Sequence, residues 1–195
     1  IMKKILLLIV CLAITNFVSA QATYTSNATG NWASAGSWTV TSGSDSDSDA
    51  WPDSNDTVII GSSHTVTVAT AAAASEITIS GVSTVLNLNA NLTVSGDVTN
   101  GGTINITSGN FTCSGASATY TNNRYTNISA GYYLNMQGTS STLANNREIT
   151  TYATSSSTAR VIVMGTFTEA EGENGQYARY VNGLGDVGTS TGWDL

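Results

Sequence analysis

Apolar residues alternate with polar ones in short runs along most of the chain. These runs place apolar side chains two residues apart and are bounded by Gly, Asn and Ser. The clearest of them lie at 64–68, 76–80, 85–89, 92–96, 103–107 and 111–115. A period of two is typical of a β-strand with one buried face, and the other face here carries Thr or Asn. Helix signals are nearly absent, so the pattern predicts an all-β protein.

The runs also recur in a fixed order. Segment 86–96 reads Leu-Asn-Leu and then Leu-Thr-Val-Ser-Gly, and segment 104–115 reads Ile-Asn-Ile and then Phe-Thr-Cys-Ser-Gly. Segment 66–81 has the same two-part shape, and 134–136 and 161–163 are more worn copies. A short period with two or three strands per unit is typical of a β-solenoid, whose coils bury their apolar faces only by stacking. We therefore predict a right-handed parallel β-helix.

Stacking in this register fixes which side chains point inward. We expect the apolar residues of the two best-matched units to form the core: Leu86, Leu88, Leu92, Val94, Ile104, Ile106, Phe111 and Cys113. On the outer side, Asn87 would lie over Asn105, and Asn91 over Asn110. Stacked strands of this kind form amide ladders.

Two alternatives bear on this interpretation. Antiparallel hairpins in a β-sandwich would explain the turn signal at Asn100-Gly101-Gly102. The conserved order of the two half-units within the chain favours the solenoid instead. Cys113 takes the place of Val94 in the preceding unit, which predicts a small core residue rather than a reactive thiol.

Segment 21–60 differs from the repeat because it is rich in Trp. Trp32, Trp38 and Trp51 lie in it, next to the only proline of the chain. The open end of a solenoid must be covered, and large aromatic side chains, which are mostly buried in proteins, suit such a cap. A sugar-stacking platform is the alternative for Trp32 and Trp38. We expect a capping segment at 21–60 and β-helix repeats at 61–176.

The first 20 residues have the pattern of a secretory signal peptide. A short cationic start precedes an apolar run of ten residues at 5–14, and small residues at 18–20 offer a cleavage site. Ten residues are too few to cross a bilayer, which needs about 20. Cys11 as a lipoprotein anchor is disfavoured, because Val10 stands where a small residue is required. The mature chain is thus expected to be secreted or displayed on the outer cell surface, with no transmembrane segment.

The composition of the chain limits the classes of binding partner. Without residues 1–20, four arginines stand against 13 acidic residues, a net charge of −9. This charge argues against nucleic acid and anionic membranes as partners. The hydrophobic content of 41% fits a folded core better than disorder.

Both ends of the chain resemble a group of extracellular Bacteroidota proteins. The first stretch carries G-N-W at 30–32, a second Trp at 38, P-x-x-x-D-x-V-x-I at 52–60 and H-T-V-T-V at 64–68. The second carries Y-x-R-Y-V at 177–181 and G-W-D-L at 192–195. The resemblance implies a surface-attached or secreted protein exported by the type IX route. It also implies that 177–195 begins a further β-segment, truncated at Leu195.

An acidic loop offers a candidate metal site. Its aspartates fall at positions 1, 3, 5, 9 and 12 of a twelve-residue calcium loop, a spacing that can wrap oxygen ligands around Ca²⁺: Asp45, Asp47, Asp49, Asp53 and Asp56. Ala50 replaces the glycine expected at position 6, and Pro52 stiffens position 8. A solvated Ser/Asp loop is the alternative. Calcium is the only cofactor that the sequence indicates.

Catalytic constellations are hard to build from this sequence. His64 is the only histidine, and Glu76 and Asp97 are the only acidic residues between it and Gly115. Glycosidases need two carboxylates about 5–9.5 Å apart. The later alternating group, Glu169, Glu171 and Glu173, is expected to lie in an exposed loop. We predict no catalytic residues.

Threonine pairs would give the solenoid an outward polar ladder: Thr65/Thr67, Thr78/Ser80, Thr93/Ser95 and Thr112/Ser114. A third interpretation is ice binding, in which a flat threonine array orders water. The function that the sequence favours is a non-catalytic, adhesin-like or glycan-contacting β-helix module whose partners are extracellular glycans or other surface proteins. A β-helix carbohydrate-active enzyme, or its accessory domain, is the alternative.

Overall fold

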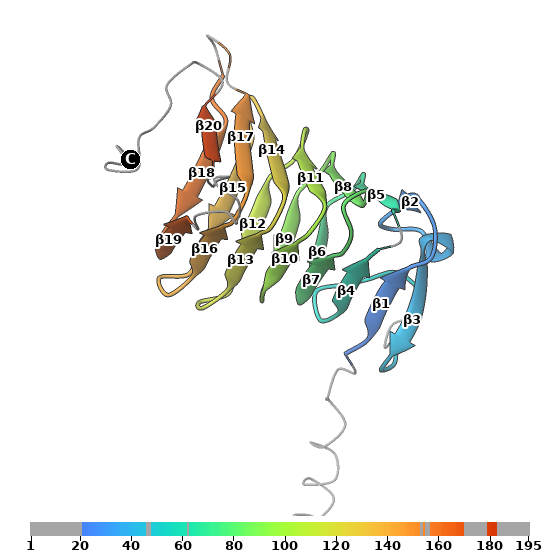
Figure 1. Ribbon diagram of the computed structural model, residues 1–195. Coiled ribbons are helices and arrows are strands. Elements are labelled where there is room, and N and C mark those ends of the chain that lie inside the picture. The colour runs from blue at the N-terminus through green and yellow to red at the C-terminus, as the bar shows by residue number, and fades with distance from the viewer. Residues whose placement is uncertain are drawn as a thin grey trace, which may run out of the picture.

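The computed structural model describes residues 21–45, 48–61, 63–152, 154, 157–169 and 179–182. Over these residues the chain is a parallel β-solenoid of about five turns, which confirms the predicted fold class. Its strands stack side by side from the N-terminal to the C-terminal end (Figure 1). The predicted signal peptide at 1–20 lies outside the described residues, as does most of 177–195. None of the described helices is long and apolar enough to span a membrane.

Three sheets form the walls of the solenoid, each named here for the rest of the text. Sheet A holds, in spatial order, β3 (Trp38–Ser42), β1 (Thr23–Ser26), β4 (Thr57–Ile60), β7 (Glu76–Ile79), β10 (Val98–Asn100), β13 (Thr119–Asn122), β16 (Thr142–Asn145) and β19 (Thr166–Glu169). Sheet B holds β2 (Gly30–Asn31), β5 (Thr65–Val68), β8 (Val85–Leu88), β11 (Thr103–Ile106), β14 (Tyr125–Ser129), β17 (Glu148–Tyr152) and β20 (Arg179–Asn182). Sheet C holds β6 (Ala72–Ala74), β9 (Leu92–Val94), β12 (Phe111–Cys113), β15 (Tyr133–Met136) and β18 (Arg160–Val163).

From the coil that starts with β4 to the coil that starts with β16, each coil contributes one strand to each sheet in turn, and successive coils pair in parallel. Leu86 pairs with Ile104, and Leu92 with Phe111, as the internal repeat predicts. The β-sandwich alternative is therefore wrong. Its turn signal at 100–102 is a corner where the chain passes from sheet A to sheet B. A Cβ at Gly102 would collide with the carbonyl oxygen of Thr84 in the coil below, so the corner requires glycine.

The interior is a stack of apolar columns. All eight side chains expected to point inward are fully buried: Leu86, Leu88, Leu92, Val94, Ile104, Ile106, Phe111 and Cys113. Phe111 packs edge-to-face on Tyr120, with ring centroids 5.7 Å apart. Burial raises the pKa of the Cys113 thiol to about 12, and the nearby charge of Asp97 adds to this effect. The thiol is therefore neutral at physiological pH and acts as a core side chain.

A polar ladder also runs inside the solenoid, at the corner between sheets A and B. Asn100 donates to the side-chain oxygen of Asn122 at 2.9 Å, and Asn122 donates to that of Asn145 at 2.8 Å. Thr126 donates to the Asn122 oxygen at 3.0 Å, and Tyr120 shares a 2.7 Å hydrogen bond with Thr126. These amides are fully buried, so each hydrogen bond replaces one that water would otherwise make.

A second amide ladder lies on the outer face of sheet B. Asn105 donates to Asn87 at 2.9 Å, as expected from the register, and Asn127 continues the row by donating to Asn105. The Asn91–Asn110 pair is linked differently from the expectation. The side-chain oxygen of Asn91 accepts from the backbone N–H of Asn110 at 2.9 Å, because both residues lie at a corner where backbone donors point along the stack.

The N-terminal coil is closed by aromatic side chains. Trp32 and Trp38 are 2% and 5% exposed and pack edge-to-face with centroids 5.4 Å apart. Trp38 also contacts Tyr24, and β3 folds back antiparallel on β1. This confirms the capping role of the Trp-rich segment and excludes Trp32 and Trp38 as an exposed sugar platform. Strands β1 and β2 nevertheless belong to the sheets, so the cap is an insertion within the first coil.

Candidate functional site

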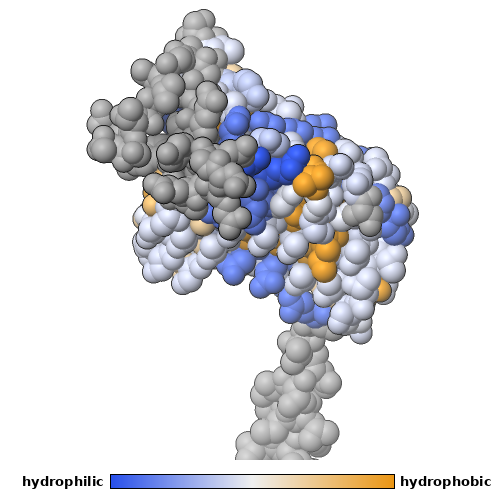
Figure 2. Space-filling model, viewed as in Figure 1, coloured by the Kyte–Doolittle hydropathy of each residue, from blue (hydrophilic) through white to orange (hydrophobic). Residues whose placement is uncertain are grey.

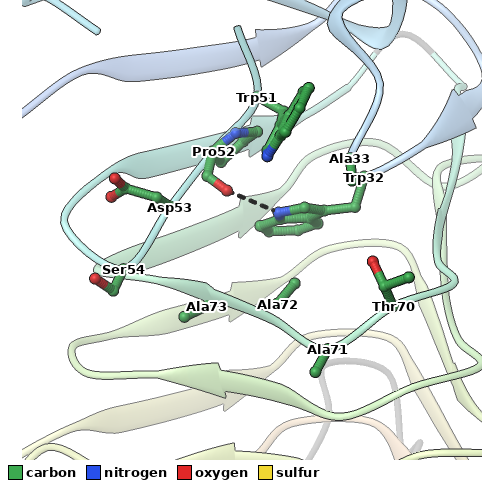
Figure 3. Close-up of a pocket in the computed structure, with 10 residues that line it drawn as sticks. All are labelled: Trp32, Ala33, Trp51, Pro52, Asp53, Ser54, Thr70, Ala71, Ala72 and Ala73. Carbon is green, nitrogen blue, oxygen red and sulfur yellow. Dashed lines mark hydrogen bonds between the residues drawn. The ribbon is translucent and has the colours of Figure 1, made fainter. Parts of the chain in front are cut away.

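A hollow lined by described residues lies where the repeat is broken. Among the described residues, the first coil contributes no strand to sheet C, so β6 is its edge strand. The chain instead passes through the cap, and the segment 51–54 runs opposite β6. An open groove of about 560 Å³ separates the two (Figure 3).

The groove has apolar walls and a polar rim. Apolar side chains line most of it: Trp32, Ala33, Trp51, Pro52, Ala71, Ala72 and Ala73. Polar groups come from Asp53, Ser54 and Thr70. Trp51 and Ala72 are partly buried against the core, so each has one side packed and one side exposed. This arrangement of a mostly apolar hollow with a few polar groups is typical of small-ligand sites.

Hydrogen bonds hold the upper wall in place. The Trp32 indole N–H donates to the Pro52 carbonyl at 3.0 Å, and the Trp38 indole N–H donates to the Trp32 carbonyl at 2.6 Å (Figure 3 shows the first). The backbone N–H of Trp51 donates to Asp49 at 3.0 Å. The buried tryptophans thus position the wall that presents Trp51. Sequence reasoning missed Trp51 as a binding residue, because its neighbours in the groove lie about 20 positions further along the chain.

The aspartates proposed for calcium bind backbone N–H groups of their own loop. Asp45 accepts from Ser48 and Ala50 through its two oxygens, at 2.9 and 3.0 Å. Asp53 accepts from Asn55 at 2.8 Å. Asp56 is buried and accepts from the backbone N–H groups of Ala22 and Asp53. The first of these bonds links the acidic loop to the residue that precedes β1. These contacts show that the described loop carboxylates shape the loop.

The loop does make the sharp turn that a calcium loop requires. Ala50, at the position where glycine was expected, has a φ of 65°, in the left-handed region that costs a residue with a side chain about 1 kcal/mol. Asp47 lies outside the described residues. Among the described residues no group of three or more metal-ligating side chains is arranged to hold an ion. Calcium binding therefore stays a prediction.

Negative charge accumulates around the base of the cap. Burial raises the pKa of Asp56, and the charges of Asp53 and Asp45 raise it further, while its two backbone donors offset part of this. Burial likewise raises the pKa of Tyr24, whose hydroxyl is next to Asp45 but outside regular hydrogen-bonding geometry. A cation or a proton near this cluster would relieve the repulsion.

The structure pairs His64 with a serine that sequence reasoning did not connect to it. The Ser26 hydroxyl lies 3.0 Å from Nδ1 of His64 and also accepts from the Gly61 N–H at 3.1 Å. The tautomer of His64 sets which of the two atoms donates in this contact. Ser26 is only 5% exposed, so its oxygen is closed to a substrate. The contact joins the first coil to the second.

Two acidic residues placed in separate repeats meet on one face. Glu76 and the residue before β10, Asp97, occupy the same register position on adjacent coils of sheet A, because Ile77 pairs with Val98. Adjacent strands are about 4.8 Å apart. Both side chains are exposed, and Asp97 accepts from the Thr119 N–H at 2.8 Å. The side chains of the Glu169, Glu171 and Glu173 group lie outside the described residues.

The threonine pairs expected to form one ladder lie on three different sheets. Thr65 and Thr67 are on sheet B, Thr78 is on sheet A, and Thr93 and Thr112 are on sheet C. They therefore do not form a single water-ordering array. A different set of threonines shares the outer face of sheet A, which we call the threonine face: Thr23, Thr25, Thr57, Thr78, Thr99, Thr119, Thr121, Thr142, Thr166 and Thr168.

The threonine face forms two columns along the stack. Thr99 pairs with Thr78 on one side and with Thr121 on the other, so these hydroxyls are in register. Ile59 and Ala144 interrupt one column, and Glu76 and Asp97 interrupt the other. In the view of Figure 2, weakly polar residues cover most of the described surface, and the most prominent apolar residues form a narrow strip.

Comparison with protein-family models, with curated proteins and with solved structures finds no match to this chain.

Proposed function

We propose that this protein is a non-catalytic extracellular module whose solenoid contacts glycans or other surface molecules through its polar outer faces. The observation that carries the proposal is the threonine face, on which hydroxyls such as those of Thr78, Thr99 and Thr121 repeat in register from coil to coil. Hydroxyls repeating at the strand spacing of about 4.8 Å can engage an extended polymer at many points, each of them weak.

The test is a binding assay with a matched pair of variants. We expect the purified chain to be retained by at least one extracellular polysaccharide, such as cellulose, chitin or xylan. The double variant Thr99→Ala/Thr121→Ala removes adjacent hydroxyls from the threonine face, and Thr93→Ala/Thr112→Ala removes an equivalent adjacent pair from sheet C. Weaker retention of the first variant alone supports the proposal. Equal retention of both variants, or no retention of the parent chain, contradicts it.

A carbohydrate-active enzyme is the second candidate, and one observation favours it. Glu76 and Asp97 lie on adjacent coils at a backbone separation compatible with a retaining glycosidase pair. Against it, both carboxylates are exposed on a flat face, and one of them binds a backbone N–H. Release of reducing ends that disappears in Glu76→Gln and in Asp97→Asn would establish this second candidate. We expect no release.

A further inference from the structure

We propose that the groove between β6 and segment 51–54 binds one neutral hexopyranose ring of a glycan, with Trp51 as its stacking platform. The proposal rests on the proposed function for the class of ligand, and it adds a defined site away from the threonine face. Pockets for small ligands have volumes of about 300–1,000 Å³. The groove, at about 560 Å³, has room for one sugar ring and for the beginning of the next.

The walls match the two kinds of surface that a pyranose presents. One face of the ring carries only C–H groups, which pack against an aromatic plane, and its edge carries hydroxyls that need hydrogen-bond partners. In the view of Figure 3, Trp51 lies above the Trp32 indole and Ala71, Ala72 and Ala73 lie below it, while Asp53 and Ser54 lie at one end of the groove and Thr70 at the other. The ring can therefore stack on Trp51 while its hydroxyls meet polar groups at both ends.

The open edge of β6 adds backbone partners. The N–H of Ala72 donates to the Asn91 carbonyl at 2.9 Å and so points toward β9. Successive residues of a strand direct their N–H and C=O groups to opposite edges, so those of Ala73 face the groove. An edge strand carries such polar groups without a strand partner. They give sugar hydroxyls a donor and an acceptor on the side opposite Trp51.

Charge selects among sugars. Asp53 lines the groove, Asp49 holds the backbone of Trp51, and the chain as a whole carries a net charge of −7. An anionic sugar would be repelled by this field, whereas a neutral ring can donate a hydroxyl to the carboxylate of Asp53. The site is therefore expected to take neutral hexoses and to reject uronic acids.

Size argues for a sugar ring over a folded protein partner. A stable protein interface buries about 800 Å² on each side, whereas the groove is lined by ten residues. An added polypeptide strand along β6 is the competing occupant. Trp32 already packs over the interior where the inward side chains of such a strand would point.

Isothermal titration of the purified chain with cellohexaose, mannohexaose, chitohexaose and hexagalacturonate tests the site. We expect heat from at least one of the first three and none from hexagalacturonate. Trp51→Ala should weaken binding at least tenfold, which corresponds to about 1.4 kcal/mol. Trp51→Phe keeps an aromatic plane, so its affinity should stay within about threefold of the parent chain. Tyr152→Ala removes another partly exposed aromatic side chain, on sheet B, and serves as the control that should change nothing.

Each result decides between the groove and the broader proposal. Unchanged affinity in Trp51→Ala overturns the groove site, and so does stronger binding of hexagalacturonate than of the neutral sugars. If polysaccharide retention then still depends on Thr99 and Thr121, the proposed function stands without the groove. If Trp51→Ala is poorly folded, the other two variants decide. Weaker sugar binding by Asp53→Asn together with retained binding by Trp51→Phe supports the site. A sugar that binds Asp53→Asn and Trp51→Phe as well as it binds the parent chain overturns the site. No heat from any neutral sugar also overturns it.

Discussion

The N-terminal end and the middle of the solenoid are stabilised in different ways. In the amide ladders of the middle coils, hydrogen-bonded side chains are 18 to 23 residues apart, and each coil rests on a near-copy of itself. Between the first and second coils the separation of hydrogen-bonded residues is 34 to 38, because the cap is inserted there. The middle uses repeated aliphatic columns and amide ladders. The end uses tryptophans, local aspartate hydrogen bonds and an antiparallel strand.

This difference indicates where a solenoid can acquire a specific site. A regular coil buries its edges on both sides and presents the same row of side chains as its neighbours. The first coil has a neighbouring coil on one side only, and among the described residues it adds no strand to sheet C, so β6 pairs with β9 on one edge and has no strand on the other. The resulting groove contains Trp51, a residue type that the middle coils lack altogether. Specificity is therefore expected at the irregular end and extended, weak contact along the regular faces.

The largest expected effect separates the two regions directly. Trp32→Ala removes a 2% exposed indole and its hydrogen bond to Pro52, and a buried Trp→Ala change costs about 3–5 kcal/mol. Because solenoid coils interact mainly with their nearest neighbours, the loss should open the end first. Hydrogen exchange should accelerate in β1, β4 and β6 before it does in β11 and β14. Equal acceleration of exchange along the whole stack would contradict the separate stabilisation of the N-terminal end and the middle coils.

The next effect concerns the inner amide ladder. Asn122→Ala removes the hydrogen bonds that Asn122 accepts from Asn100 and Thr126 and those that it donates to Asn145 and the Glu148 carbonyl, and a buried group left unsatisfied costs about 1–3 kcal/mol. We expect a loss of about 3 kcal/mol in chemical denaturation. Asn105→Ala, in the outer ladder, is the matched control. Its partners are reached by water, so it should cost about 1 kcal/mol or less. Equal losses would show that burial does not distinguish the ladders.

The strands and their register were predictable because a period of two and the 86–96 and 104–115 match determine both. The inner amide ladder was not. Asn100 stands beside two glycines and reads as a turn, and only the stacking of Asn122 and Asn145 over it makes an interior position favourable. A polar residue at a corner gives no local signal of the direction in which its side chain points.

The candidate site was predictable only in part. The concentration of Trp at 32, 38 and 51 predicted a cap, and burial of the first two confirms it. The groove depends on the missing sheet C strand of the first coil, which is a property of the stack and not of any segment. Similarly, Glu76 and Asp97 look isolated in the sequence, and the coil length alone brings them into register.

A smaller effect concerns pH at the N-terminal end. The pKa of Asp56 is raised in the folded state, so the protonated form is favoured there relative to the unfolded chain. Its contribution to stability is complete below the unfolded pKa and is lost as pH rises through the folded pKa. The free energy of unfolding should thus increase as pH falls through the folded pKa of Asp56 toward the unfolded one. For Asp56→Asn, the free energy of unfolding should rise less from its own value at pH 7 than it does in the parent chain. An unchanged increase would assign it to other groups.

The smallest expected effect is that of calcium on the acidic loop. The charges of Asp45, Asp49 and Asp56 all raise the pKa of Tyr24, so these carboxylates lie around one buried point. A divalent cation there would relieve their repulsion, although backbone N–H groups already occupy several of their oxygens. Extracellular calcium modules bind with dissociation constants of about 10⁻⁴–10⁻³ M.

At a fivefold excess over such a constant, binding to the folded state alone adds about 1 kcal/mol. Thermal melts with calcium, with magnesium and with a chelator measure this increment, and Asp49→Asn should remove it while leaving the Asp45 and Asp56 contacts in place. Magnesium should give less, because it demands stricter octahedral geometry than a loop of this kind supplies. Equal midpoints with calcium and with chelator would mean that the aspartates serve only to hold the backbone of the cap. The N-terminal end would then differ from the middle of the solenoid in hydrogen bonding and aromatic packing, with no ion involved.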